Sequence, residues 1–214
     1  MKFYHKKEPL GPHNFDVLCV LFGGLLGDMY GETRANKSRF HFKQSNRNQE
    51  YLHWIHSFLS LRGYCNCQKP IQNKIIGKNN KIYYALRGRT YSFTSLNWLV
   101  DCFYSTGAKR IPSDDICEIF LTPLALAVWI SDDGTAPTKG GVLIATDCFC
   151  RSDLLRMAGL LKRKYDLKTN LRSRGNRKDG ISAFNLYIPR SELAKLQEIV
   201  KLHMCSSMHY KLHL

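Results

Sequence analysis

Two segments of the chain have the same pattern of residues, and this repeat constrains the fold more than any other feature. The segments "VLFGGLLGDMYG" and "LALAVWISDDGT" are apolar, contain many small residues and end on an acid. Aligning them places Asp28 over Asp133, about 105 residues further along the chain. The repeat predicts a protein made of two similar halves.

The first segment fits either a strand or a helix, because apolar runs of this length are ambiguous by periodicity alone. Its glycines do not form the G-x-G-x-x-G motif of a dinucleotide site, and the following "RANKSRFHFKQS" alternates like a strand instead of opening a helix. We therefore predict a helix over 17–28 that ends near Asp28. The second segment resembles it and has a clear start, with Thr122 as N-cap and Pro123 in the first helical position.

The elements after each helix are predicted in the same order: two strands, a helix, two strands and a final helix. In the first half these include a strand at 38–45, a helix at 48–63 with Gly63 just beyond it, a hairpin at 67–93 turning at 77–80, and a helix at 95–107. In the second half they include a strand at 140–147, a helix at 152–166 with Ser152 or Asp153 near its cap, a hairpin at 168–189 turning within 175–180, and a helix at 191–204. We divide the chain into a subdomain at 1–106, a linker at 107–120 and a subdomain at 121–214.

Small residues in the two repeated helices predict that these helices pack against each other. Glycine inside a helix costs about 1 kcal/mol relative to alanine, so several in one short helix call for a close backbone contact. The small residues are Gly23, Gly24 and Gly27 in the first helix and Ala125, Ala127 and Ser131 in the second. If the helices lie side by side, Asp28 and Asp133 lie together at their ends.

Two carboxylates in this position repel each other and face the negative ends of both helix dipoles. The arrangement becomes favourable when a cation lies between them. Hard divalent cations such as Mg²⁺ accept oxygen ligands and leave positions for water and phosphate. The alternative is that both acids are exposed residues at helix ends with no common role.

The charge of the chain indicates a polyanionic partner. Its 214 residues carry 32 Lys and Arg against 17 Asp and Glu, a net charge of +15. The basic residues are spread evenly, with fifteen in 1–106 and seventeen in 107–214, which favours a long basic face over a detachable tail. Nucleic acid is the usual partner of such a surface, although a protein that is merely basic and soluble would have the same composition.

Other classes of protein are disfavoured by the composition. No run approaches the roughly 18 apolar residues that span a bilayer, and the first residues "MKFYHKKEPLGPHNF" lack the apolar core of a secretory signal. We expect the protein to act in the compartment where it is made, and its eight cysteines to be free thiols. The C-x-C pairs Cys65/Cys67 and Cys148/Cys150 do not have the usual spacing of structural zinc ligands.

The two repeated segments resemble the motifs of the LAGLIDADG homing endonucleases, in the branch that carries both motifs in one chain. The words "LLGD", "LTP" and "W-x-x-DDG" are typical of its intron-encoded members, and the resemblance covers about residues 15 to 214. It implies an α+β fold of two pseudo-symmetric αββαββα subdomains, with the motif helices at the interface and two antiparallel sheets forming a saddle on DNA.

The resemblance also implies an activity. Members of this family cut both strands of a long asymmetric DNA site, which initiates intron mobility. On this basis Asp28 and Asp133 are the metal-binding catalytic acids, and Asp132 is a secondary candidate. We expect Mg²⁺ as cofactor, Mn²⁺ as a substitute, and Ca²⁺ to bind without supporting cleavage.

Two lysines follow the last helix of their own half, Lys109 in "AKRIP" and Lys211 in "MHYKL". By comparison with the family they would stabilise the charge of the transition state or orient the attacking water, or else hold a phosphate. The family places further water-ordering side chains on its early strands. Lys43, Gln44 and Asn46 lie near that place, whereas Ala145, Thr146 and Asp147 in the second half match poorly.

Side chains on the outer face of such sheets read bases or hold phosphates, and the sequence alone does not separate the two roles. The predicted DNA-binding residues are Arg34, Arg39, His41, Lys43, Lys69, Gln72, Lys74, Tyr83, Arg87, Arg89, Lys139, Arg172, Arg174, Arg177 and Lys178.

Three functions remain possible on this fold. The first is a metal-dependent DNA endonuclease, favoured because acids occupy both motif positions. The second is an RNA maturase that binds intron RNA and needs no catalytic acid. The third is a DNA-binding regulator that no longer cleaves. We expect a monomer that does not contact membranes, located in a mitochondrion or chloroplast if the host is a eukaryote and in the cytoplasm otherwise.

Overall fold

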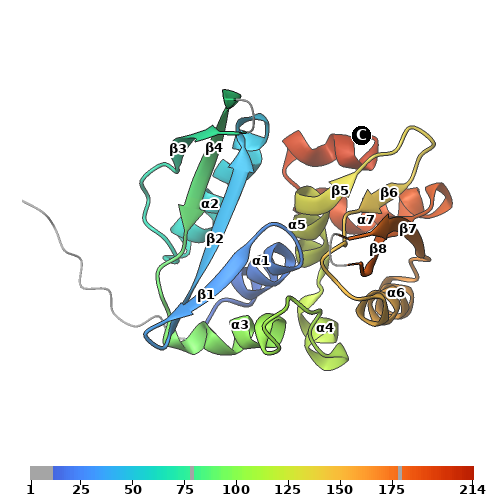
Figure 1. The fold of residues 1–214 in the computed structure, drawn as a ribbon, viewed down its shortest axis with the longest axis horizontal. Coiled ribbons are helices and arrows are strands. Elements are labelled where there is room, and N and C mark those ends of the chain that lie inside the picture. Colours follow the sequence, from blue (N-terminus) through green and yellow to red (C-terminus); the bar gives the residue numbers. More distant parts are fainter. Residues whose placement is uncertain (1–11, 78–79, 178–179) are drawn as a thin grey trace, which may run out of the picture.

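The protein consists of two halves with the same architecture, seen side by side in the computed structural model (Figure 1). The structure describes residues 12–77, 80–177 and 180–214. The first half contains α1 (Phe15–Leu26), β1 (Tyr30–Arg34), β2 (Lys37–Ser45), α2 (Gln49–Leu61), β3 (Ile71–Ile76), β4 (Ile82–Arg89) and α3 (Asn97–Tyr104). The second contains α5 (Pro123–Asp133), β5 (Gly134–Thr135), β6 (Val142–Ile144), α6 (Arg151–Tyr165), β7 (Asn170–Asn176), β8 (Ser182–Ile188) and α7 (Leu193–Val200).

Each half forms one antiparallel four-stranded sheet with equivalent strand orders, β1-β2-β4-β3 and β5-β6-β8-β7. This confirms the predicted α+β fold and the repeat. The first two strands of the second sheet are much shorter than those of the first, with 2 and 3 residues against 5 and 9. The region predicted as a linker includes one further helix, α4 (Asp114–Phe120).

Helices α1 and α5 pack side by side at the centre, between the two sheets (Figure 1). A Cβ atom on Gly23 would lie 2.2 Å from the carbonyl oxygen of Ala125, and one on Gly27 would lie 2.5 Å from Cβ of Asp132. These two positions therefore accept only glycine at this helix separation, as predicted. Gly24 differs from that prediction, because it faces the side chain of Met29 in its own half.

Local sequence signals account for two of the helix boundaries, the start of α5 and the end of α2. Thr122 caps α5 by accepting a hydrogen bond from the Ala125 N–H, with Pro123 in the first turn. Gly63 follows α2 with a φ of +79°, a value that glycine adopts without strain. Ser152 and Asp153, predicted to lie near the cap of α6, fall in its first turn, and the N-cap residue itself is Cys150.

The core runs through both halves and across the helix pair. The side chains of Phe22, Trp129 and Tyr51 are fully buried there. In the part of the chain that is described, no helix has both the length and the apolar character to cross a membrane. All eight cysteines lie in the described residues, and none of them forms a disulfide.

Candidate active site and nucleic-acid interface

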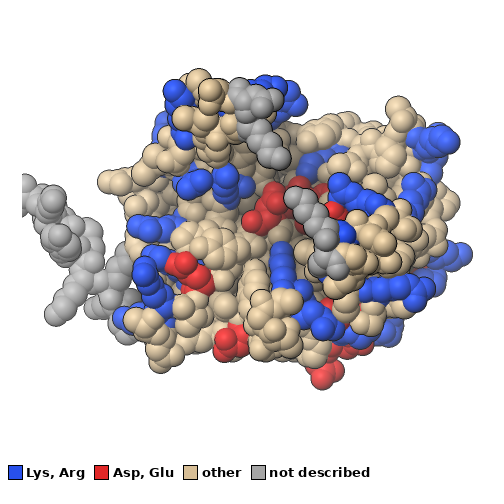
Figure 2. Space-filling model, viewed as in Figure 1, with Lys and Arg blue, Asp and Glu red and all other residues tan. Residues whose placement is uncertain are grey.

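The two motif helices end next to each other and each presents an acid. Asp28 follows the C-cap residue Gly27 of α1 and is exposed, whereas Asp133 is the half-buried last residue of α5. Burial, followed by the negative charge of Asp28, raises the pKa of Asp133 to about 7. In Figure 2 a group of acidic side chains lies at the centre of the viewed face, between the halves, with Lys and Arg on both sides.

Lys109 and Lys211 are brought to the same helix ends in equivalent ways. The ammonium of Lys109 donates to the carbonyl oxygen of Gly27 at 2.8 Å. That of Lys211 donates to the carbonyls of Ser131 at 2.5 Å and Asp132 at 3.0 Å. Each lysine thus pairs with the unsatisfied carbonyls at a helix C-terminus, where a cation is favourable.

Both lysines lie close to several negatively charged side chains. Burial lowers the pKa of Lys109 and of Lys211, while Asp28, Asp132 and Asp133 oppose that shift. The acids therefore help to keep each ammonium charged. The two ammonium groups, which lie among these three carboxylates, can balance negative charge that develops on a reacting phosphate.

Asp132 precedes Asp133 in the chain, but its side chain lies next to Asp28. Its half-buried carboxylate points across the interface, where Oδ2 accepts a hydrogen bond from the backbone N–H of Asp28 at 3.2 Å. Its Oδ1 accepts one from Nε2 of Gln44 at 3.3 Å. Asp132 therefore belongs structurally to the Asp28 side of the site, although it comes from the other half.

Gln44 links this acid pair to the first sheet. Its Nε2 also donates to Oδ2 of Asp28 at 2.9 Å, and its Oε1 accepts from the side chain of Asn48 at 3.1 Å. Of the polar residues predicted here, Gln44 thus reaches the acid directly. Asn46 does not, since it accepts a hydrogen bond from Gln72 of β3, the strand on the far side of β4.

The second half has no matching amide. Thr146 occupies the place that corresponds to Gln44, but it is fully buried and its hydroxyl donates to the carbonyl of Phe184 at 2.8 Å. Asp147 pairs with Arg174 instead of with the acids. The sequence at these positions matches the family poorly, and in the structure neither Thr146 nor Asp147 forms a hydrogen bond with the acids.

Asn48 and Tyr51 are residues that the sequence did not single out. Asn48 orients Gln44, and the fully buried Tyr51 donates to the carbonyl of Val128 in α5 at 3.3 Å. Asn48 and Tyr51 follow Gln44 closely in the sequence, across the turn into α2. This proximity could have identified them as site residues only if the pairing of Gln44 with Asp28 had been known.

The chemistry of the helix ends fits a hard divalent cation. Two facing carboxylates and the raised pKa of Asp133 are both relieved by a positive ion between them. Within residues 12–77, 80–177 and 180–214, no group of three or more His, Cys, Asp or Glu side chains could hold a metal ion by itself. An ion shared by Asp28 and Asp133 would therefore take its other oxygen ligands from water and a phosphate.

The first sheet presents a basic face beside this site. Lys43 lies opposite Arg87 and His41 opposite Arg89 on the two central strands, so these four side chains share one face. Arg39 and Arg34 lie on the same face further out, with Arg39 paired to Glu32. This row was predicted to contact DNA, and the structure gives it one common surface.

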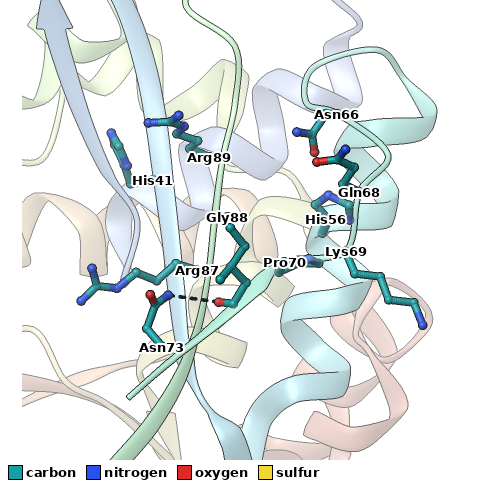
Figure 3. Close-up of a pocket in the computed structure, with 11 residues that line it drawn as sticks. His41, His56, Asn66, Gln68, Lys69, Pro70, Asn73, Arg87, Gly88 and Arg89 are labelled. Atoms are coloured by element: carbon teal, nitrogen blue, oxygen red, sulfur yellow. Dashed lines mark hydrogen bonds between the residues drawn. The ribbon is translucent and has the colours of Figure 1, made fainter. Parts of the chain in front are cut away.

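A polar hollow of about 440 Å³ lies where β3 starts beside β4 (Figure 3). Its lining residues include His41, Lys69, Arg87 and Arg89 together with the side-chain amides of Asn66, Gln68 and Asn73. A hollow lined by several cations and amides can bind phosphate oxygens and the polar edges of bases.

Two predicted contacts face the other way. Gln72 lies opposite Leu86 and Lys74 opposite Tyr84, which places both on the face turned away from Lys43. A one-residue shift in strand register moves a side chain to the opposite face, and the sequence did not define the register of β3.

The second sheet uses more of its basic residues in internal contacts. The guanidinium of Arg172 lies 3.2 Å from the ring centroid of Tyr187. Arg177 donates to the carbonyl of Asp147 at 3.1 Å, and Arg174 pairs with its carboxylate. Lys139 is exposed in the loop between β5 and β6, and Lys178 lies outside the described residues.

Comparison with known proteins agrees with this architecture. The sequence profile of the LAGLIDADG DNA endonuclease family matches residues 18–196. The chain belongs to this family. Its fold is shared with the homing endonuclease I-WcaI bound to its DNA recognition sequence, with a TM-score of 0.80 and 19% identity over 95% of this chain and 94% of that one.

Relatives of this LAGLIDADG protein include proteins named as maturases and proteins named as endonucleases. The cytochrome b mRNA maturase bI2 of Saccharomyces cerevisiae is 34% identical over 95% of this chain. The intron-encoded endonuclease ai4 of Dictyostelium discoideum is 30% identical over 74% of this chain and 98% of its own length. The chain spans only 48% of the length of the yeast maturase.

Proposed function

We propose that this LAGLIDADG protein is a site-specific endonuclease that makes a double-strand break in a long asymmetric DNA target and so initiates intron mobility. The observation that carries the proposal is the convergence of Asp28 and Asp133 at the ends of two packed helices. Each helix end also holds a lysine, half-buried at Lys109 and buried at Lys211, and a basic sheet face flanks the pair.

Asp28 and Asp133 would hold the divalent cation, with Mg²⁺ the expected ion, Mn²⁺ a substitute and Ca²⁺ a non-productive ligand. When bound, the ion polarises the scissile phosphate and the attacking water. Lys109 and Lys211 stabilise negative charge near the helix ends, and Gln44 holds Asp28 in place from the sheet. The outer faces of both sheets would contact the major groove of the DNA.

The second candidate is an intron RNA maturase, which the name of the yeast relative favours. A maturase needs a basic surface but not a pair of acids closely supported by lysines. The two functions are compatible in one chain, so the decisive question is whether this protein cuts DNA. Both functions would place it in the compartment whose genome carries the intron, which is a mitochondrion or chloroplast if the host is a eukaryote and the cytoplasm otherwise.

The test is cleavage of a duplex that carries the intron-less insertion site. We expect double-strand breaks with Mg²⁺ or Mn²⁺, tight binding without cleavage in Ca²⁺, and no breaks in EDTA. Binding should weaken steeply as salt rises, because each phosphate contact releases counterions. Tight binding of this duplex without cleavage in either Mg²⁺ or Mn²⁺ would contradict the endonuclease and leave the maturase as the better interpretation.

A further inference from the structure

The hairpin of β3 and β4 carries an apolar row on the DNA-facing side of the first sheet. Ile71 lies opposite Arg87 and Ile75 opposite Tyr83, so these side chains share the face that also carries Lys43. Ile71 is 71% exposed and Tyr83 is 49% exposed. Apolar side chains grouped on a surface in this way indicate a contact with a partner.

The row offers few hydrogen bonds to a partner. Its central polar residue, Asn73, turns its side-chain N–H onto the carbonyl of Ile71 at 3.1 Å. Across from Asn73 lies Ala85, which has no polar side chain. Apart from the oxygen of Asn73 and the hydroxyl of Tyr83, this face of the hairpin presents methyl groups and one aromatic ring, framed by cations at Lys43 and Arg87.

The row reaches the catalytic centre. A hollow of about 530 Å³ is lined by both Asp28 and the hairpin residues Ile75 and Tyr83. Lys43 and Ser45 of β2 line it as well. A duplex bound with its scissile phosphate at Asp28 would thus place its neighbouring base pairs over these apolar side chains.

The major groove contains one apolar feature, the C5-methyl group of thymine, while the other groups at base edges are donors and acceptors. We propose that Ile71, Ile75 and Tyr83 form a thymine-reading surface, which contacts the C5-methyl groups of the base pairs nearest the cut on the Asp28 side. This inference rests on the proposed function, because it takes duplex DNA as the ligand. The surrounding positive charge is complementary to the phosphates of that duplex.

The equivalent hairpin of the second half has a polar residue in place of Ile71, so thymine contacts of this kind are expected on one side of the cut only. On β7 and β8 the residue that corresponds to Ile71 is Arg172, which lies opposite Asn185. Arginine and asparagine read guanine and adenine by hydrogen bonds. Thymine methyl groups are therefore expected to matter next to the cut on the Asp28 side and not on the Asp133 side.

The experiment starts with selection of duplexes from a library randomised over about 30 base pairs, by binding to the wild-type protein in Ca²⁺. We expect T·A or A·T pairs to be enriched beside the cut on the Asp28 side. Replacing those thymines with deoxyuridine, which lacks only the methyl group, should weaken binding about fourfold per methyl. The same replacement on the Asp133 side should leave binding unchanged.

Variants identify the side chains involved. Ile75→Asn should lose the discrimination between thymine and deoxyuridine. Ile76→Asn should keep it, because Ile76 is the next residue on the same strand, is 66% exposed and points to the opposite face. The deoxyuridine comparison uses wild-type protein, so it stays decisive if Ile75→Asn does not fold.

Three results would overturn the inference. Equal binding of thymine and deoxyuridine duplexes that the wild-type protein cuts would reject thymine reading while leaving the endonuclease intact. A concentration-dependent dimer that Ile71→Asn dissolves would assign the row to a second copy of the chain. Failure of wild-type protein to bind any duplex would reject both this inference and the proposed function.

Discussion

The two motif helices end in the same way but are supported differently. At both ends an acid lies beside a lysine that donates to the last helix carbonyls. Before the acid, however, the first helix has Gly27 and the second has Asp132, whose carboxylate fills the space that the glycine leaves. As a result Asp28 is held by Asp132 and Gln44, and nothing similar holds Asp133 among the described residues.

This difference shows how two halves with the same fold can differ in side-chain contacts at the axis that relates them. Where two equivalent positions meet, close packing leaves room for one large side chain and requires a small residue opposite. The half that receives the large side chain gains contacts that its partner cannot reproduce. The two DNA strands are therefore expected to meet different catalytic environments.

The largest expected effect tests what the halves have in common. Asp28→Asn and Asp133→Asn should each reduce cleavage of both strands by roughly 100- to 1000-fold, because each removes a charge that a shared cation requires. A duplex with different labels on its two strands measures both cuts at once. Binding in the absence of cleavage controls for folding. Wild-type cleavage of either strand by one variant would mean that the acids act separately.

Removal of the lysines tests the second shared feature. Lys109→Met and Lys211→Met should each slow cleavage by about 100-fold and leave DNA affinity within a few-fold, if the ammonium stabilises charge in the transition state. Single-turnover rates and equilibrium binding are measured in parallel. A variant that loses affinity but cuts bound DNA at the normal rate would show that its lysine only holds a phosphate.

The third prediction concerns the feature that differs. Gln44→Ala and Asp132→Ala should each slow one strand by about tenfold more than the other, and the same strand in both cases, because both side chains position Asp28. Their effects should not add in the double variant, since the residues belong to one hydrogen-bond network. Thr146→Val, which removes a hydroxyl bonded away from the acids, serves as the matched control in the second half.

Equal slowing of both strands by Gln44→Ala would remove the proposed asymmetry. So would a strand bias of the same size in Thr146→Val. The time course of nicked and linear products from a supercoiled plasmid gives the same information independently, because unequal strand rates accumulate a nicked intermediate.

The smallest effect concerns how each lysine is anchored. The segment that carries Lys109 is tied by Asp153, which is 2% exposed and accepts hydrogen bonds from Arg110, Arg156 and the N–H of Ile111. Burial opposes ionisation of Asp153, but these donors outweigh it and lower its pKa to about 2. Its contribution to stability is therefore present above the unfolded-state value of 3.8 and is lost as pH falls towards 2.

Asp153→Asn should destabilise the fold by about 2 kcal/mol at neutral pH, an effect that disappears towards pH 2. Thermal unfolding at several pH values measures it. The segment that carries Lys211 is held by a neutral bond from Gln197 to the carbonyl of Leu212 at 2.8 Å. Gln197→Ala should cost only about 1 kcal/mol, with no dependence on pH over this range.

Much of the architecture was predictable from the sequence. The repeat, the close packing of the motif helices and the meeting of Asp28 with Asp133 all follow from local patterns. Small residues at helical spacing, apolar periodicity and cap residues such as Thr122 are written in consecutive positions. The positions of Lys109 and Lys211 followed from family resemblance, and their catalytic role stays a prediction.

Only the tertiary structure decided the neighbours of these groups. Whether Asp132 points to solvent or to Asp28 depends on how two helices about 105 residues apart are rotated against each other. Whether Gln72 faces the basic surface depends on the register of β3, which the predicted turn at 77–80 did not fix to the residue. Local patterns specify which elements form and which of their faces are apolar. Beyond the pair of motif helices, the contacts between distant elements are specified by packing, which no single stretch of sequence contains.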